Sequence, residues 1–150
     1  MTHLAQLNVG RTRHDVEAPE MAGFMDNLDR VNAIAERSPG FVWRMQDESG
    51  NATGIKPTED PRFITNLSVW KDFGSFEHFV WNTVHKQFYR RKAEWFEPFG
   101  RPHFVMWHIA EGEIPTLDEA LDRLDDLTRN GPTDRAFGWE RFADMESDAE

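Results

Sequence analysis

The amino-acid sequence of 150 residues predicts an α+β fold of the ferredoxin-like type, a four-stranded antiparallel sheet with an added C-terminal helix. Several short stretches alternate apolar and polar residues, which is the period of a β-strand with one buried face. Longer stretches repeat apolar residues at steps of three and four, which is typical of amphipathic helices. Their order is strand, helix, strand, strand, helix, strand and helix, so two βαβ-like halves joined by a hairpin precede the last helix.

Alternation of side chains places the strands and their two faces. The predicted strands cover residues 3–11, 41–46, 63–71 and 103–109. In the first strand, Ala5, Leu7 and Val9 point one way, and Asn8 points the other way. Trp70 and Met106 are expected on one face of the sheet, and Trp43, Val69 and Trp107 on the opposite face. Both faces therefore carry large apolar side chains that need cover.

Amphipathic helices are predicted at residues 21–35 and 75–96. The first ends near Pro39, because proline cannot continue a helix. The second has Ser75 as its expected N-cap, since a serine hydroxyl can accept a hydrogen bond from the first turn. If these two helices cover only one face of the sheet, the other face must be covered by a second subunit, so we expect a homodimer.

A third helix is predicted after Pro115, where Thr116 and Glu119 form a capping box. Asn130, Gly131 and Pro132 end it. We expect one domain over residues 1–143, followed by an acidic and disordered tail at residues 144–150. The connection 47–61 is longer than a hairpin needs, which is typical either of a mobile lid or of a simple insertion.

Composition excludes several classes of function. The chain has no cysteine, so thiolate metal sites and disulfides are ruled out and a cytoplasmic location is expected. It has no apolar run of the roughly 20 residues that span a membrane. The net charge is −10, and residues 113–150 hold 12 acidic against 4 basic side chains. This balance argues against nucleic acid and anionic membranes as partners.

The helix predicted at residues 75–96 concentrates cations in an acidic chain. At 100° per residue, Arg91 falls inside the apolar arc and His85 lies at its edge. A charge in a buried stripe needs a partner, so Arg91 and its neighbour Arg90 are candidates to bind a carboxylate or phosphate. The alternative is a salt bridge to Glu94 or Glu97, with the arginine stem packed over tryptophan.

A second candidate site lies on the sheet. Side chains of equal parity place polar groups on one face: Asn8, Asn66, Ser68, Trp70 and His108. A row of polar groups on a covered face indicates either a ligand cavity with hydrogen-bonding capacity or a wet dimer interface. No metal site is predicted, since His78 and His85 are about 10 Å apart along the helix.

Several segments together resemble the dimeric α+β barrel superfamily, which includes the antibiotic-biosynthesis monooxygenases, and more closely a bacterial domain-of-unknown-function family within it. The segments are Leu7–Gly10, Arg37–Arg44, Leu67–Trp70, Arg91–Phe96 and Ile114–Ala120. The resemblance implies the fold and a dimer, and by itself no reaction.

Haem-degrading monooxygenases of that superfamily offer a further resemblance. They carry an Asn on the first strand, a Val-Trp-Lys at the end of the third and a His-Lys on the second helix, where Asn8, Trp70 and His85 stand here. Phe79 or Trp81 would take the place of their helix tryptophan. The resemblance implies His85 as a haem ligand, but the interval from Trp70 to His85 is shorter by about one helical turn. The cofactor is therefore left open between none and haem.

These observations predict a small-molecule-handling homodimer, in the first place a monooxygenase-like oxidoreductase with a pocket between the second helix and the sheet. His85 would be the base, or the axial ligand of a haem, and Asn8 and Trp70 would orient the substrate. Two alternatives remain, which leave open whether the protein is an enzyme. One is a non-catalytic ligand- or haem-binding protein in which Arg91 holds an anion, and the other is a structural dimer whose pocket is filled by its own aromatic side chains.

Overall fold

The computed structural model describes residues 2–15, 17–46, 62–82, 91–98 and 102–139. Four of the sequence predictions concern other residues. His85, Arg90, the connection 47–61 and the tail at residues 144–150 lie outside the described residues.

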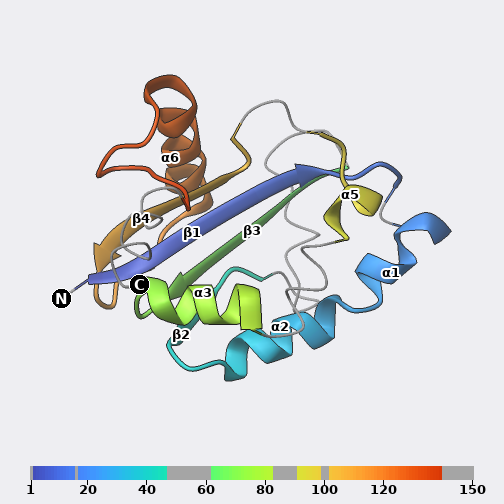
Figure 1. Ribbon diagram of the computed structural model, residues 1–150, viewed down its shortest axis with the longest axis horizontal. Coiled ribbons are helices and arrows are strands. Elements are labelled where there is room, and N and C mark those ends of the chain that lie inside the picture. Colours follow the sequence, from blue (N-terminus) through green and yellow to red (C-terminus); the bar gives the residue numbers. More distant parts are fainter. Residues whose placement is uncertain (1, 16, 47–61, 83–90, 99–101, 140–150) are drawn as a thin grey trace, which may run out of the picture.

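The sheet has the predicted ferredoxin-like topology. Its strands are β1 (Thr2–Arg11), β2 (Phe41–Arg44), β3 (Phe63–Trp70) and β4 (Phe104–Ala110). They lie in the order β2-β3-β1-β4, and every neighbouring pair is antiparallel. The first strand of the sequence is therefore central, with β3 on one side and β4 on the other (Figure 1). The α+β class predicted from the sequence is confirmed.

The helical segments are η1 (Pro19–Met21), α1 (Ala22–Met25), α2 (Leu28–Arg37), α3 (Phe73–Asn82), α5 (Lys92–Trp95) and α6 (Leu117–Asn130). None of the described helices is long and apolar enough to cross a membrane. The predicted capping box of α6 is confirmed, because the Thr116 side chain accepts a hydrogen bond from the Glu119 N–H at 3.1 Å.

The prediction of one continuous helix over residues 21–35 is wrong, because the segment breaks between α1 and α2. The Asn27 side-chain amide donates to the Gly23 carbonyl at 2.9 Å. In an uninterrupted helix that carbonyl would pair with the Asn27 N–H, which instead donates to the Phe24 carbonyl at 3.3 Å. A local side-chain hydrogen bond has thus replaced a helical one.

The predicted start of the next helix also needs correction. Asp72, and not Ser75, is the N-cap of α3, since its Oδ1 accepts a hydrogen bond from the Ser75 N–H at 2.8 Å. Hydrogen bonds from the Ser75 side chain and backbone hold the pKa of the Asp72 carboxyl below its ordinary value. At its other end the predicted helix is interrupted, because Arg91 lies in a turn. The end of α5 is hydrogen-bonded to the residues that follow β1, since the Arg13 N–H donates to the Trp95 carbonyl at 2.8 Å.

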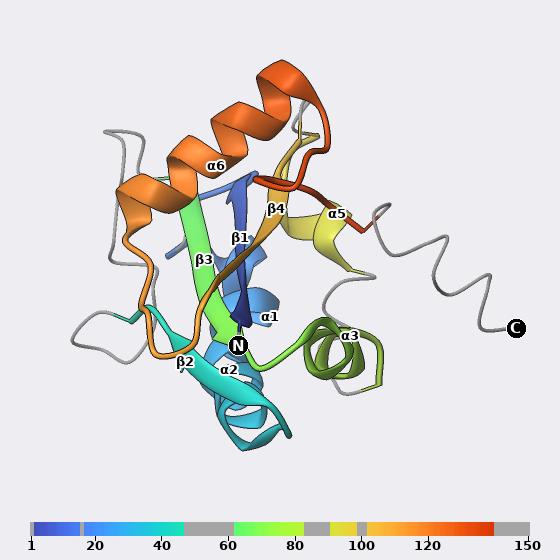
Figure 2. The same ribbon diagram turned by 90° about the vertical axis from the view of Figure 1, so that its left-hand side faces the viewer.

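Helices cover both faces of the sheet: α2 and α3 cover one face, as expected, and α6 covers the face that was expected to lack a helix. The α3 face carries Leu4, Gln6 and Asn8 of β1 and packs against α2 and α3. The α6 face carries Ala5, Leu7 and Val9 and packs against α6. Figure 1 shows α6 above the strands and α2 and α3 below them, and Figure 2 shows the same separation from the side.

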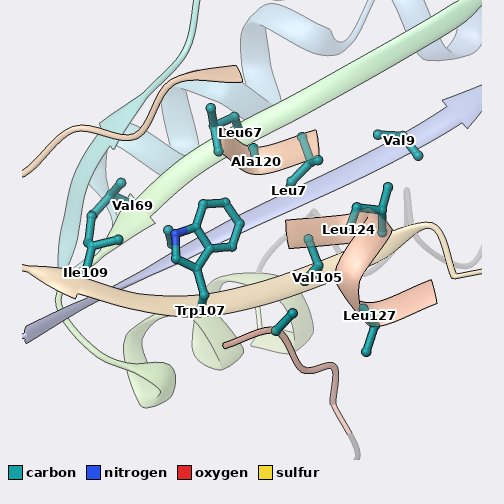
Figure 3. Packing of buried hydrophobic residues seen from close by; sticks show 12 residues of the cluster. Leu7, Val9, Leu67, Val69, Val105, Trp107, Ile109, Ala120, Leu124 and Leu127 are labelled. Atoms are coloured by element: carbon teal, nitrogen blue, oxygen red, sulfur yellow. The ribbon is translucent and has the colours of Figure 1, made fainter. Parts of the chain in front are cut away.

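The α6 face holds an apolar core. Leu124 and Leu127 of α6 lie over Leu7, Val105 and Trp107 of the sheet (Figure 3). A helix of 14 residues with one apolar stripe must bury that stripe, and the sheet face left open by α2 and α3 is the available apolar surface. The chain thereby supplies from its own C-terminal part some of the cover that the sequence assigned to a partner.

The turn between α2 and β2 is packed against the start of α3. Gly40 in this turn has a φ of 83°, and its carbonyl accepts a hydrogen bond from the Lys71 N–H at 2.7 Å. A Cβ on Gly40 would overlap the Cβ and Oγ of Ser75. Glycine is therefore required here both for the left-handed backbone and for the close approach.

We expect Gly40→Ala to lower the free energy of unfolding by about 3 kcal/mol, because the strain of a positive φ adds to the overlap with Ser75. Gly112→Ala is the matched control: Gly112 has a φ of 88°, and a Cβ added to it would meet no atom within 4 Å. It should cost about 1 kcal/mol, from backbone strain alone. Urea unfolding measures both losses. Equal losses would show that Gly40 does not pack on Ser75.

Candidate functional site

A row of polar side chains crosses β1 and β3 on the α3 face. We call it the polar row and define it as Gln6, Asn8, Asn66 and Ser68. Gln6 lies directly opposite Ser68, and Asn8 directly opposite Asn66. The equal parity that the sequence predicted for Asn8, Asn66 and Ser68 is thus confirmed. Gln6 was not predicted as a site residue, although its position two residues before Asn8 places it on the same face.

Gln6 links the polar row. Its Nε2 donates to Ser68 Oγ at 2.7 Å and to Asn66 Oδ1 at 2.9 Å, and its Oε1 accepts from Asn8 Nδ2 at 3.0 Å. The Gln6 side chain is central and buried, with only 1% of the residue exposed. Because a buried amide must have its hydrogen bonds satisfied, these contacts fix the orientation of both asparagines.

Two atoms at the outer end of the polar row have hydrogen-bonding capacity left over. Within the described part of the chain, Asn8 Oδ1 and Asn66 Nδ2 have no hydrogen-bond partner. Asn66 is exposed and Asn8 is half-buried, so both atoms are able to meet a small molecule. One is an acceptor and the other a donor. The arrangement suits a ligand that carries a hydroxyl or carbonyl oxygen.

Trp70 is joined to the inner end of the polar row. Its Nε1 donates to Ser68 Oγ at 2.9 Å, and its ring stacks on Phe79 with 5.1 Å between centroids. Phe41 meets the same indole edge-on at 5.4 Å. Trp70 is 1% exposed. Trp70 is therefore a buried residue that holds the Ser68 end of the polar row in place. Its predicted role in contact with a substrate stays a prediction.

The two aromatic residues predicted on the helix face different neighbours. Phe79 is buried against Trp70, whereas Trp81 is half-buried with its ring 5.9 Å from that of Trp139. Only Phe79 is therefore connected to the polar row through Trp70. Trp139 belongs to the segment that follows α6.

His108 shares the α3 face with Asn8 but lies at its other end. His108 of β4 is the cross-strand neighbour of Leu4 on β1, whereas Asn8 on β1 has Phe104 of β4 as its cross-strand neighbour. Its imidazole is exposed and packs against the Phe137 ring at 5.4 Å. The described structure does not bring His108 together with the polar row.

Arg91 is not in a buried stripe, so its predicted position is wrong. Its side chain is 53% exposed, its Nε lies 2.8 Å from Glu94 Oε2, and its guanidinium lies 4.7 Å from the centre of the Trp95 ring. The mutual hydrogen bond raises the pKa of Arg91 and lowers the pKa of Glu94. The salt bridge and tryptophan packing were the alternative that the sequence left open, and that alternative is confirmed.

Two buried hydroxyls on β3 provide a test of the polar row. Ser68, 6% exposed, accepts hydrogen bonds from Gln6 and Trp70, whereas the Thr65 hydroxyl, on the α6 face and 5% exposed, has no partner in the described structure. We expect Ser68→Ala to cost about 1–3 kcal/mol, because it leaves the Trp70 N–H without an acceptor. Thr65→Val should be neutral or stabilising. Thermal and urea unfolding compare the two, and equal losses would contradict a special role of Ser68.

Comparison with protein families gives a match over nearly the whole chain. The model of the family described as domain of unknown function DUF3291 matches residues 3–150. A comparison with curated protein sequences gives no match.

Solved structures share the fold at low sequence identity. Protein SO0527 from Shewanella oneidensis is 12% identical, with a TM-score of 0.54 over 72% of this chain and 91% of the solved chain. The NE2512 protein of unknown function from Nitrosomonas europaea is also 12% identical, with a TM-score of 0.50 over 77% and 97%. A variant of SnoaB, a cofactor-independent oxygenase from Streptomyces nogalater, is 16% identical, with a TM-score of 0.50 over 76% and 98%. Identities this low establish the fold alone.

Proposed function

The chain belongs to the DUF3291 family, and we propose that it is a monooxygenase-like oxidoreductase that binds an electron-rich aromatic compound at the polar row. The observation that carries this proposal is the pair of open hydrogen-bonding atoms, Asn8 Oδ1 and Asn66 Nδ2, held by Gln6 beside aromatic rings. The likeness in fold to a cofactor-independent oxygenase supports the choice of reaction class.

The proposed substrate has three fused rings, and its central ring carries a CH₂ group on one side and a carbonyl group on the opposite side. Loss of a proton gives an electron-rich anion, which supplies the electrons for O₂. One oxygen atom becomes a new carbonyl on that carbon, and the other leaves as water with the two hydrogens. No external reductant is consumed. The protein has to bind the anion, orient it and take up its proton.

Each group of the polar row has a proposed role. The Asn66 amide donates to the oxygen on which the negative charge of the anion gathers, and Asn8 Oδ1 orients a substrate hydroxyl. Gln6 holds both amides in place. The general base is proposed to be His85, because imidazole titrates near neutral pH, although this residue lies outside the described residues.

Haem is not part of the proposed reaction. The haem-binding hypothesis would use His85 as axial ligand, with the macrocycle between the second helix and the sheet. Along the described α3, that space is filled by aromatic rings: Phe79 stacks on Trp70 at 5.1 Å, and Phe76 meets Trp70 at a tilt at 5.7 Å. The described side chains therefore do not fit a haem at this position.

The second candidate function is non-catalytic binding of an aromatic ligand. The observation that favours it is the dense aromatic packing around α3, which provides stacking surface without any described acid or base at the polar row. Binding without oxygen uptake would distinguish this function from the oxidoreductase.

The homodimer is also part of the proposal. At its β2 and β3 end, the α6 face carries the half-buried side chains of Trp43, Met45 and Phe63, while α6 itself packs mainly over β1 and β4. A second copy that covers the β2 and β3 half of this face would complete the burial. A cytoplasmic location stays a prediction, supported by the absence of cysteine.

The catalytic proposal is tested with anthrone, which has the required CH₂ group. We expect oxygen uptake by the wild-type protein, and a loss of about 100-fold in kcat/KM in Asn66→Ala, because one donor to the developing oxyanion is removed. Asn130→Ala on α6 is the matched control and should keep full activity, since Asn130 only pairs with Asp126. An oxygen electrode measures the rates. Absence of uptake with anthrone and its hydroxylated derivatives would contradict the proposal.

The dimer is tested separately by Trp43→Glu. A carboxylate in the proposed contact should convert the dimer into a monomer, because burying an unpaired charge is costly. Sedimentation equilibrium measures the mass, and Val42→Glu serves as control, because Val42 lies at the register shift between Phe41 and Trp43 and is already 41% exposed. A monomeric wild-type protein would overturn this part of the proposal.

A further inference from the structure

The end of the described chain places a tryptophan ring into a group of aromatic side chains on the α3 face. We call this group the aromatic slot and define it as Phe73, Phe76, Trp81 and Phe104, with Trp139 inside it. The Trp139 ring is parallel to the Phe76 ring within 1° at 5.4 Å, and to the Phe104 ring within 13° at 5.1 Å. Phe73 and Trp81 meet it at an angle, at 5.7 Å and 5.9 Å.

The aromatic slot has the geometry of a site for a flat ring. Parallel, offset rings and tilted edges at 5–6 Å are the arrangements that aromatic groups prefer in binding. The slot also adjoins the polar row, because Phe104 is the cross-strand neighbour of Asn8 on the same face of the sheet. A flat compound in the place of the Trp139 indole would therefore stack on Phe104, whose cross-strand neighbour Asn8 has an Oδ1 without a hydrogen-bond partner among the described residues.

Trp139 is attached more weakly than the buried Trp70 of the same face. The buried Trp70 has its indole N–H bonded to Ser68, whereas Trp139 is half-buried and its N–H has no partner in the described structure. The segment after α6 crosses β4 (Figure 2), and it is tied there by one β-bridge, the two backbone hydrogen bonds between Phe137 and Met106 at 2.7 Å and 3.0 Å. Within the described part of the chain, the contacts that hold Trp139 are its ring contacts.

We propose that Trp139 is a displaceable plug, and that the aromatic slot binds a flat, hydroxylated aromatic compound when the Trp139 ring swings out. This inference rests on the proposed function and deepens it, because it assigns the ring of the substrate to the slot and its oxygen to the polar row. Phe137 stays paired with Met106, so the movement involves Gly138 and Trp139. The protein is then autoinhibited by its own Trp139 side chain.

Competition with an internal ring has a measurable consequence. If the plug is out in about one molecule in ten or fewer, it weakens the apparent affinity at least tenfold, since only the open state binds. We expect 2-naphthol to bind Trp139→Ala at least about tenfold more tightly than wild type, as measured by calorimetry under anaerobic conditions. Phe24→Ala is the control, because Phe24 is a half-buried ring in a separate aromatic group with Trp95 and Phe96.

A second measurement follows the wild-type chain and uses a conservative variant for resonance assignment alone. The six tryptophans are labelled with 5-fluorotryptophan, and Trp139→Phe assigns one ¹⁹F resonance. Saturating 2-naphthol should move the Trp139 resonance toward the position of a solvent-exposed indole and leave that of the buried Trp107 unchanged. A Trp139 resonance that stays in place, or equal affinities in Trp139→Ala and Phe24→Ala, would overturn the plug.

Oxygen uptake with anthrone separates this inference from the proposed reaction. Tighter binding in Trp139→Ala without any oxygen uptake would support the plug hypothesis and contradict the oxygenase reaction. Equal oxygen uptake and equal affinity in wild type and Trp139→Ala would support the oxygenase reaction and contradict the plug hypothesis.

Discussion

The side-chain amide of Gln6 lies in the central strand, almost completely buried, and its hydrogen bonds must be made inside the protein. Ser68 and Asn66 on β3 and Asn8 on β1 make them. This constraint sets the character of the whole α3 face. The hydrogen bonds of Gln6 orient both asparagines. Ser68, which accepts from Gln6, also accepts from the indole N–H of Trp70, and the aromatic side chains of α3 pack around that indole.

The two faces of the sheet consequently have different properties. The α6 face is an apolar core in which aliphatic side chains of α6 and the sheet meet, a kind of contact that stabilises a fold without directing a ligand. The α3 face combines fixed amides with aromatic rings, and such a combination offers both stacking and directional hydrogen bonds. Both faces therefore contribute buried apolar surface, but only the α3 face combines it with directional hydrogen-bonding groups among the described residues.

The C-terminal part of the chain serves both faces. Helix α6 covers the apolar face, and the segment after it crosses β4 and delivers Trp139 to the aromatic face. The same stretch of chain thus completes the core and occupies the surface beside the candidate site. The 14-residue helix is anchored by its buried leucines, and Phe137 after it is buried and paired with Met106, so the proposed movement is confined to the Trp139 ring beyond that pair.

The sequence alone determined the strands, the parity of β1, β3 and β4, the topology and the capping box of α6, because these depend on local periodicity and on short hydrogen-bonding patterns. The parity of β2 was not determined, because a register shift between Phe41 and Trp43 puts these two side chains on opposite faces. Parity also placed Asn8, Asn66 and Ser68 on one face. Periodicity says which side chains are buried, but not against what, so only the tertiary structure put α6 on the second face and paired exposed Arg91 with Glu94. The linking role of Gln6 and the stacking of Trp139 on Phe76 depend on atoms that only the fold brings together. The break at Asn27 depends on a side-chain hydrogen bond that competes with a helical one. Contacts of these kinds produce no periodic pattern in the sequence.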